Sequence, residues 1–267
     1  MLCTSLEKIR RYEIRRAMQF LSVVYRKKED DMAWDHRLED WPRALTTFHL
    51  QPSQTALLII DVQRYCADPS IGLAAVVAAN HPTYASYAFP RLKEIVLPNI
   101  ARLIALFRNR GLRLVFFTNG PECADGSDFR TTRRLSDLDR QHSRGVPTIF
   151  PKGSPGHAIM PEVAPQAGEL VFNKRTTSAF VTTGIDSLLR SLGISNVICT
   201  GLTTEACVES TARSAVDLGY GALMVEDACQ TFEKAAHDWS LRNFARNFGR
   251  VANTKTVIRE LTENAQS

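Results

Sequence analysis

Five short segments of the chain are apolar on both faces and show no helical period: residues 55–63, 112–118, 170–174, 197–201 and 222–227. Between them, apolar residues recur at helical spacing over 92–110, 184–192, 207–218 and around 239–248. Strands that are apolar on both faces are typical of the centre of a parallel sheet. The alternation of such strands with helices predicts a three-layer α/β/α fold with a mainly parallel central sheet, closed by a last strand around 251–258.

Two stretches between these elements, residues 64–90 and 121–157, are rich in glycine, proline and polar residues. We predict them as long loops that wall a pocket. The N-terminal pattern differs, because residues 5–28 predict an amphipathic helix and residues 29–54 an irregular arm. The chain is therefore expected to consist of an N-terminal extension, 1–54, and one domain, 55–267. The arm is expected to pack on its own domain or on a neighbouring subunit.

The composition, with 44% hydrophobic and 23% charged residues among 267, is typical of a soluble globular protein. Scattered arginines account for much of the net charge of +5, and the main basic concentration lies at residues 10–28. We interpret it as a solvated helix face or, alternatively, as a contact surface, and expect no nucleic-acid partner. No apolar run has the length of a membrane span, and the N-terminus lacks the apolar core of a signal peptide, so neither a membrane partner nor export is expected.

Six cysteines, at positions 3, 66, 123, 199, 207 and 229, form no C-x-x-C pair and no Cys/His cluster with zinc-finger spacing. This favours reduced thiols in a cytoplasmic protein over a disulfide scaffold. Cys207 follows the fourth strand, where the sheet is succeeded by a helix. A helix N-terminus lowers the pKa of a thiol, so Cys207 is a candidate nucleophile. A buried structural cysteine is the alternative.

Polar side chains end three other predicted strands. Asp61 ends the first, where a buried charge is unfavourable unless it faces a cleft or a partner, although it could also cap a helix or turn. Asn119 ends the second, where it binds substrate or forms a turn before Gly120. Lys174 ends the third. Because the carboxyl ends of parallel strands meet at one edge, we expect Asp61, Lys174 and Cys207 to converge there.

These three side chains are chemically complementary. A carboxylate whose pKa is raised by burial can accept the proton of a thiol. A lysine ammonium between them would stabilise the thiolate and hold the carboxylate in place. The set predicts nucleophilic catalysis by a cysteine.

Several short motifs occur in the order in which one known superfamily has them. They are Leu58-Ile59-Ile60-Asp61-Val62-Gln63, Lys174 with Ser178-Ala179-Phe180, Gly201-Leu202-Thr203-Thr204-Glu205-Ala206-Cys207-Val208, Lys152-Gly153-Ser154 with Ile159-Met160-Pro161-Glu162, and Glu226-Asp227-Ala228. Over about residues 55–258 the chain thus resembles the cysteine-hydrolase branch of the isochorismatase-like superfamily, which has a Rossmann-like fold.

The resemblance implies a catalytic triad of Asp61 as general base and then acid, Lys174 as electrostatic support and Cys207 as the nucleophile that forms a covalent acyl-enzyme. It also implies a cis peptide bond between Leu202 and Thr203, which directs the N–H groups of Thr203 and Cys207 at the oxyanion. It implies no cofactor. Because the family is usually oligomeric, it implies a homo-oligomer, a dimer or a tetramer.

Two features bear on the expected substrate. Members that hydrolyse the enol ether of isochorismate lack the nucleophilic cysteine, so Cys207 favours a carbon–nitrogen bond. Nicotinamidases carry a metal site on an Asp-x-His motif that residues 62–130 do not contain, so no metal is expected. The Gly-x-Thr-Thr-x-x-Cys motif is similar to the branch that acts on carbamoyl and ureido compounds such as biuret, N-carbamoylsarcosine or ureidoacrylate.

We therefore expect a metal-independent cysteine amidohydrolase whose partner is a small linear amide or ureide. A nicotinamidase-like amidase and a non-catalytic binding protein of the same fold are the alternatives. Asn119 is a candidate substrate ligand, and the sequence leaves open whether Asn119, Glu205 or Gln230 contacts the substrate.

Overall fold

The computed structural model describes residue 38 and residues 46–263, without the side chains of residues 140–144. The chain divides into two compact units, Met1–Glu39 and Asp40–Ser267, and the fold described here is that of the second. The helix expected over 5–28 and most of the expected arm lie outside the described residues. The end of the arm packs on its own unit, because Leu50 is fully buried and its N–H donates to Glu260 at 2.7 Å.

The described residues contain one sheet of six parallel strands, in the order β3-β2-β1-β4-β5-β6. The strands are β1 (Thr55–Ile60), β2 (Arg113–Asn119), β3 (Leu170–Lys174), β4 (Asn196–Leu202), β5 (Gly221–Gln230) and β6 (Arg250–Ala252). Every residue of β1 and β4 is buried, as expected of central parallel strands. The predicted fold class is confirmed.

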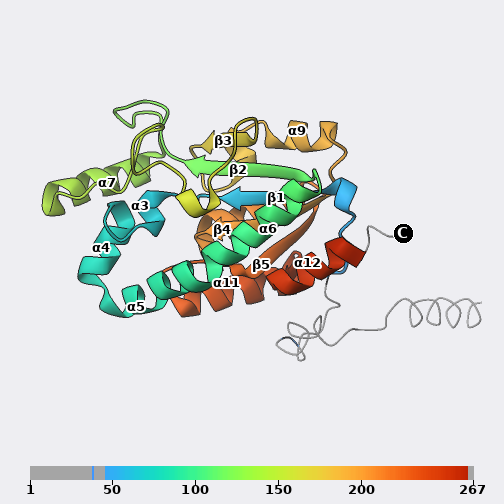
Figure 1. Ribbon diagram of the computed structural model, residues 1–267. Coiled ribbons are helices and arrows are strands. Elements are labelled where there is room, and N and C mark those ends of the chain that lie inside the picture. Colours follow the sequence, from blue (N-terminus) through green and yellow to red (C-terminus); the bar gives the residue numbers. More distant parts are fainter. Residues whose placement is uncertain (1–37, 39–45, 264–267) are drawn as a thin grey trace, which may run out of the picture. The chain divides into compact units, whose positions relative to one another are not determined.

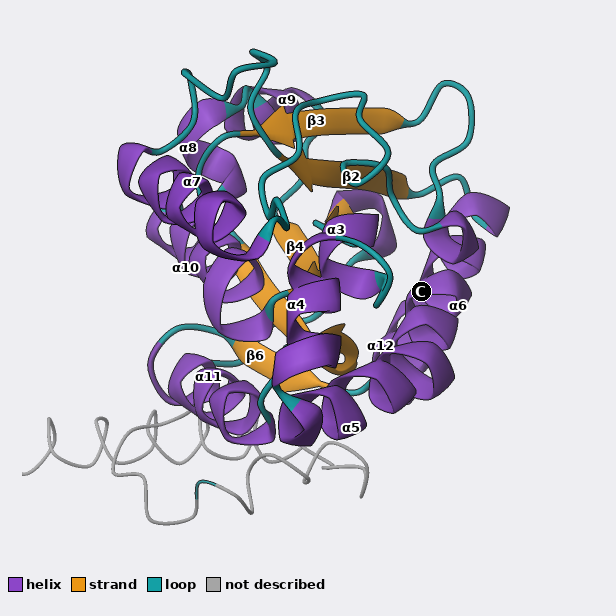
Figure 2. Cartoon of the chain, turned by 90° about the vertical axis from the view of Figure 1, so that its left-hand side faces the viewer, coloured by secondary structure: helices purple, strands orange, loops and turns teal. Residues whose placement is uncertain are grey.

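Helices cover both faces of this sheet. They are α3 (Arg64–Ala67), α4 (Gly72–Asn80), α5 (Pro82–Arg91), α6 (Leu97–Asn109), α7 (Thr131–Arg144), α8 (Ala179–Thr182), α9 (Ile185–Ser191), α10 (Glu209–Asp217), α11 (Lys234–Asn247) and α12 (Thr254–Glu263), with 3-10 turns at Pro52–Gln54 and Pro161–Val163 and π-helical turns at Leu92–Val96 and Thr204–Val208. Helices α6 and α12 lie on one face and α8, α10 and α11 on the other (Figure 1, Figure 2). The unit therefore has three layers.

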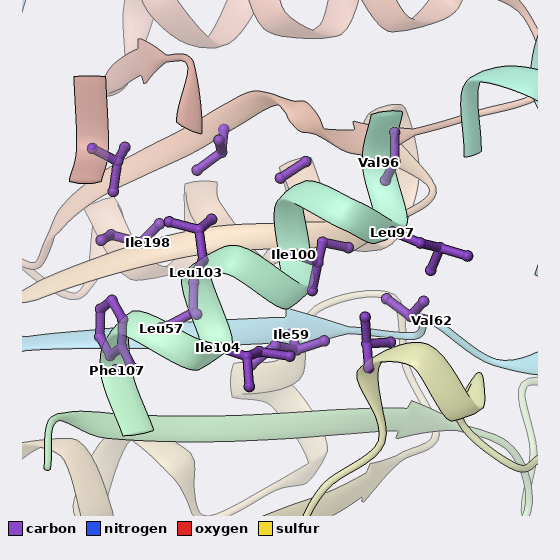
Figure 3. Packing of buried hydrophobic residues seen from close by; sticks show 14 of the residues in the cluster. Leu57, Ile59, Val62, Val96, Leu97, Ile100, Leu103, Ile104, Phe107 and Ile198 are labelled. Carbon is purple, nitrogen blue, oxygen red and sulfur yellow. The ribbon is translucent and has the colours of Figure 1, made fainter. Parts of the chain in front are cut away.

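The hydrophobic core includes a dense contact between the sheet and α6. Buried residues of α6 face Leu57 and Ile59 of β1: they are Ile100, Leu103, Ile104 and Phe107 (Figure 3). Their spacing of three and four residues places them on one side of the helix. Leu58 and Ile60, which alternate with the first pair along β1, are buried toward the opposite layer. Burial on both faces fixes β1, and with it the position at which the chain leaves the strand at Asp61.

The prediction of a long loop over 64–90 is wrong, because this segment forms α3, α4 and α5. Pro82 lies in the first turn of α5, where its missing N–H leaves no hydrogen bond unmade. Gly72, with φ of +66°, begins α4. The second expected loop, 121–157, contains α7. Helices α3 and α4 lie in front of the edge at which the strands end (Figure 2).

The last strand is also shorter than predicted. Only Arg250–Ala252 forms β6, and residues 254–263 form α12. The β-branched residues at Val257 and Ile258 favour a strand locally. Tertiary packing outweighs that preference, because Val257 and Leu261, four residues apart, are both fully buried on one side of the helix.

Candidate active site

The predicted site residues lie at the carboxyl edge of the sheet. Asp61 follows β1, Lys174 is the last residue of β3, and Cys207 lies five residues after the end of β4. From β1 the chain continues toward α6 on one face of the sheet, and from β4 toward α10 on the other. Open α/β sheets bind ligands at such a switch point. Asp61 has φ of 52°, a left-handed conformation that aspartate adopts more readily than most residues.

Asp61 and Lys174 form a buried ion pair. Lys174 Nζ donates to Asp61 Oδ2 at 2.6 Å, and the two side chains are 0% and 3% exposed. Burial opposes the charge on Lys174, but the interactions of Lys174 with Asp61 and Cys207 outweigh this effect, so the pKa of Lys174 is raised. Burial also raises the pKa of Asp61, and Lys174 only partly offsets this. Lys174 therefore stays protonated, and Asp61 is a stronger base than an ordinary aspartate.

The thiol of Cys207 interacts electrostatically with both members of this pair. Burial raises the pKa of Cys207 to about 12, with a further increase from Asp61 and an opposing effect of Lys174. The resting side chain is thus a neutral thiol, which needs a base to become a thiolate. Asp61 Oδ1 is buried and has no hydrogen-bond partner among the described residues. It is the carboxylate oxygen that remains available to accept a proton.

Helix α11 holds the segment that carries Cys207. The segment begins as a π-helical turn and continues directly into α10. Thr204 Oγ1 lies 2.8 Å from His237 Nδ1. Glu209 accepts a hydrogen bond from Ser240 Oγ at 2.7 Å. These buried contacts fix the segment on both sides of Cys207.

Thr203 lies where β4 meets this segment. The peptide bond between Leu202 and Thr203 is cis. The carbonyl oxygen of Thr203 accepts from the N–H groups of Ala206 and Val208, both at 3.2 Å. Thr203 also lines a small cavity.

Asn119 is paired in register with Lys174 on the neighbouring strand. Its side-chain Nδ2 donates to the carbonyl oxygens of Lys174 at 3.2 Å and Thr176 at 3.0 Å. Its backbone N–H donates to Gln63 Oε1 at 2.7 Å. The side-chain amide of Asn119 therefore holds the chain around Lys174, and a direct role in substrate binding stays a prediction. Glu205 is exposed and accepts a hydrogen bond from Thr231 Oγ1 at 2.8 Å.

Sequence reasoning missed the contribution of α3 to the site. Burial raises the pKa of Tyr65 and of Cys66, and electrostatic interactions with Asp61 and Cys207 raise both further. Helix α3 therefore lies near Asp61 and Cys207. The available signal was the pair Tyr65-Cys66 four and five residues after Asp61, which was assigned to a loop.

Other kinds of site receive no support from the described part of the chain. No three His, Cys, Asp or Glu side chains there are grouped so that they could hold a metal ion. The five cysteines within residues 46–263 are free thiols. None of the helices described is both long enough and apolar enough to cross a membrane.

The fold and the site together define a parallel α/β protein with a cysteine, an aspartate and a lysine at its switch point. The model of the Isochorismatase domain matches residues 55–256. The chain therefore belongs to the isochorismatase family, which confirms the resemblance seen in its motifs.

Individual known proteins are similar to the chain in sequence or in fold. Ureidoacrylate amidohydrolase RutB of Acinetobacter baylyi is 29% identical over 226 residues, which cover 81% of this chain and 87% of the relative. A cysteine hydrolase from Pseudomonas syringae has a similar fold, with a TM-score of 0.69 and 22% identity over 84% of this chain and 99% of its own. N-carbamoylsarcosine amidase from Thermoplasma acidophilum has a TM-score of 0.53 and 23% identity over 75% of this chain and 96% of its own.

Proposed function

We propose that the protein is an amidohydrolase that cleaves the carbon–nitrogen bond of a small linear amide, carbamoyl or ureido compound through a covalent acyl-enzyme on Cys207. The observation that carries the proposal is the buried pair of Asp61 and Lys174 beside the Cys207 thiol. The similarity to a ureidoacrylate amidohydrolase supports the type of bond and the ureido class.

The first half-reaction forms the acyl-enzyme. The Asp61 carboxylate accepts the proton of the Cys207 thiol, and the thiolate attacks the substrate carbonyl carbon to form a carbon–sulfur bond. The carbonyl electron pair moves onto oxygen, where the N–H groups of Thr203 and Cys207 stabilise it. Donors of this kind contribute on the order of 100-fold or more in rate. When the oxyanion collapses, the carbon–nitrogen bond breaks and Asp61 returns its proton to the leaving nitrogen.

The second half-reaction releases the acyl group. Asp61, again ionised, removes a proton from water, and the oxygen attacks the thioester carbon. The carbon–sulfur bond breaks, the thiolate takes the proton from Asp61, and the acid leaves. For a ureido substrate this acid is carbamic acid if the inner nitrogen leaves, and it decomposes to ammonia and carbon dioxide; if the terminal nitrogen leaves, ammonia is released in the first half-reaction and the acid is an N-substituted carbamic acid. Lys174 stays charged throughout and stabilises the thiolate while Asp61 is neutral.

Ammonia release tests the proposal directly. The panel is biuret, triuret, ureidoacrylate, N-carbamoyl amino acids and nicotinamide, each with the unmutated protein, Cys207→Ala and Cys123→Ala in the presence of EDTA. Cys123 is an exposed free thiol and serves as the matched control. We expect turnover of a ureido compound that survives EDTA, persists in Cys123→Ala and is lost in Cys207→Ala.

Mass spectrometry of acid-quenched reactions should show the acyl group on the peptide that contains Cys207. Turnover by Cys207→Ala would contradict the cysteine mechanism. Nicotinamide turnover that EDTA abolishes would instead favour a nicotinamidase-like amidase. Absence of turnover throughout the panel would favour a binding protein of this fold.

The same proposal extends to the organisation of the protein. We propose a cytoplasmic homo-oligomer in which residues 1–54 form an extension of the domain at 55–267. Light scattering coupled to size-exclusion chromatography, on the full chain and on a chain that begins at residue 46, tests the contribution of the extension. A monomeric mass for the full chain would contradict the oligomer.

A further inference from the structure

Gln230 is the last residue of β5 and lies beside the end of β4. It is paired in register with Leu202, the residue before Thr203. Strand β5 is irregular before this pair: Cys199 and Gly201 lie two residues apart on β4, but their partners Met224 and Cys229 lie five apart on β5. The three extra residues of this bulge set the position at which Gln230 meets the end of β4.

The orientation of the Gln230 amide is fixed by its surroundings. The side chain is 3% exposed, and Nε2 donates to the carbonyl oxygens of Ala88 at 3.1 Å and of Thr231 at 2.6 Å. A flipped amide would place Oε1 against these two acceptors, which is unfavourable. Oε1 therefore points away from both carbonyl groups.

Gln230 Oε1 has no hydrogen-bond partner among the described residues. Buried amide oxygens normally accept at least one hydrogen bond, so an unpartnered one requires an explanation. Gln230 lines a small cavity, whose other residues are mostly apolar: Cys66, Ala88, Phe89, Leu92, Leu202, Thr203, Thr231 and Phe232. The cavity walls therefore include a glutamine whose acceptor is unused.

The cavity is also lined by the residue whose N–H is the proposed oxyanion donor. Thr203 directly follows the register partner of Gln230 on the adjacent strand. The carbonyl carbon of an amide or ureide bears both an oxygen and a nitrogen that carries hydrogen. One such group therefore offers an acceptor to the Thr203 N–H and a donor to Gln230 Oε1.

We propose that Gln230 Oε1 accepts a hydrogen bond from a nitrogen attached to the carbonyl group that Cys207 attacks. This inference rests on the proposed amidohydrolase function and narrows the substrate class. The enzyme would select amides and ureides that carry an N–H at this carbonyl and reject esters and analogues whose nitrogen is fully alkylated. Gln230 acts here as a specificity-determining residue.

Ligand binding to Cys207→Ala protein tests the inference without turnover. The probes are the panel ureide that the unmutated protein hydrolyses fastest and two analogues, one with both terminal N–H hydrogens replaced by methyl groups and one methylated at the inner nitrogen. We expect one analogue to bind at least about tenfold more weakly than the parent ureide, as measured by calorimetry. The ratio of the dissociation constants of this analogue and the parent should fall to within about twofold when Gln230→Met is added, because the loss of the amide weakens binding of the parent.

The matched control is Gln63→Met. Gln63 is also buried near the end of a strand, but its Oε1 accepts from the Asn119 N–H at 2.7 Å and its Nε2 donates to the His157 carbonyl at 2.8 Å. Its loss should weaken the parent compound and the analogue equally and leave the ratio unchanged. If Gln230→Met does not fold, Gln230→Asn replaces it in the same test. Its side chain is shorter by one methylene, so the amide oxygen no longer reaches the ligand.

The possible outcomes separate this inference from the proposed function. The role of Gln230 is contradicted if the ratio is near one in the Cys207→Ala protein, or if it is large and persists in the Gln230 variants. In both cases, turnover of a ureide would still support the amidohydrolase function. A ratio that falls in the Gln230 variants alone supports the role. If the protein neither hydrolyses nor binds any ureide, this result contradicts both the role of Gln230 and the proposed amidohydrolase function.

Discussion

A Cβ atom on Gly201 would lie only 2.0 Å from the carbonyl oxygen of Ile60. The two residues are paired between β4 and β1, and Gly201 has φ of 117°, a conformation that residues with a side chain rarely adopt. Ile60 directly precedes Asp61, and Gly201 lies two residues before Thr203. The close approach of these backbones therefore brings the proposed base and the proposed oxyanion donor to the same place.

Gly201→Ala should consequently abolish most of the activity and destabilise the fold. Gly111→Ala is the control, because Gly111 also has a positive φ, 61°, but nothing lies within 4 Å of an added Cβ. The control measures the conformational cost alone, about 1–2 kcal/mol. In urea unfolding, Gly201→Ala should lose at least about 2 kcal/mol more, from steric overlap. Equal losses in the two variants would show that the contact with Ile60 is not restrictive.

Lys174→Met should be strongly destabilising because it leaves the buried carboxylate of Asp61 without a partner. Breaking a buried pair in this way costs about 3–5 kcal/mol. The double variant Asp61→Asn/Lys174→Met removes both charges and should recover a large part of that loss, although it stays inactive. Lys152→Met is the control, since Lys152 and Glu122 are 56% and 46% exposed and such pairs contribute at most about 1 kcal/mol. Denaturant unfolding of all four proteins gives the comparison, and similar losses for both lysine variants would contradict a tightly coupled buried pair.

The activity should fall on acidification with an apparent pKa above the ordinary range of aspartate. The pKa of Asp61 is raised, mainly by burial, and the proposed mechanism needs its ionised form to accept the thiol proton. Lowering the pH through this raised pKa protonates the base, so kcat/KM decreases. The profile should be measured from pH 3 to 9 with near-ultraviolet circular dichroism as a control for unfolding. An acid limb near 3.9, the unperturbed aspartate value, would show that Asp61 is not the titrating base.

Much of this architecture follows from local sequence features. The strands β1 and β4 are predictable because central parallel strands are apolar on both faces. Asp61 and Lys174 could be selected as candidates because a charge at the end of such a strand is unfavourable unless it has a partner or faces a cleft. The helices between 64 and 91 were missed because Gly72 and Pro82 resemble loop residues when their position in a helix is unknown.

Other parts of the site depend on tertiary contacts that no local pattern contains. The unused oxygen of Gln230 is recognisable only because two backbone carbonyls, from α5 and from the residue after β5, fix the amide. The role of Asn119 likewise depends on which carbonyl groups the neighbouring strand presents to it. Residue type and spacing can identify a polar group at a strand end, but not which of its atoms remain free.

A buried histidine behind the nucleophile segment should make the stability of the protein dependent on pH. Arg91 Nη2 lies 3.3 Å from His237 Nε2, and His237 Nδ1 lies 2.8 Å from Thr204 Oγ1. Burial and the positive charge of Arg91 lower the pKa of His237 to about 4.

Because the unfolded chain protonates this histidine near pH 6.5 and the folded chain only near 4, stability is lost as the pH falls through that window, by up to about 3 kcal/mol. His237→Gln should reduce the slope of unfolding free energy between pH 6.5 and 4, measured by urea titration. Part of the slope should remain, since burial also lowers the pKa of His157. His81→Gln, at an exposed position, should leave the slope unchanged. If His237→Gln and His81→Gln give the same slope as the unmutated protein, His237 is not held neutral in the folded state.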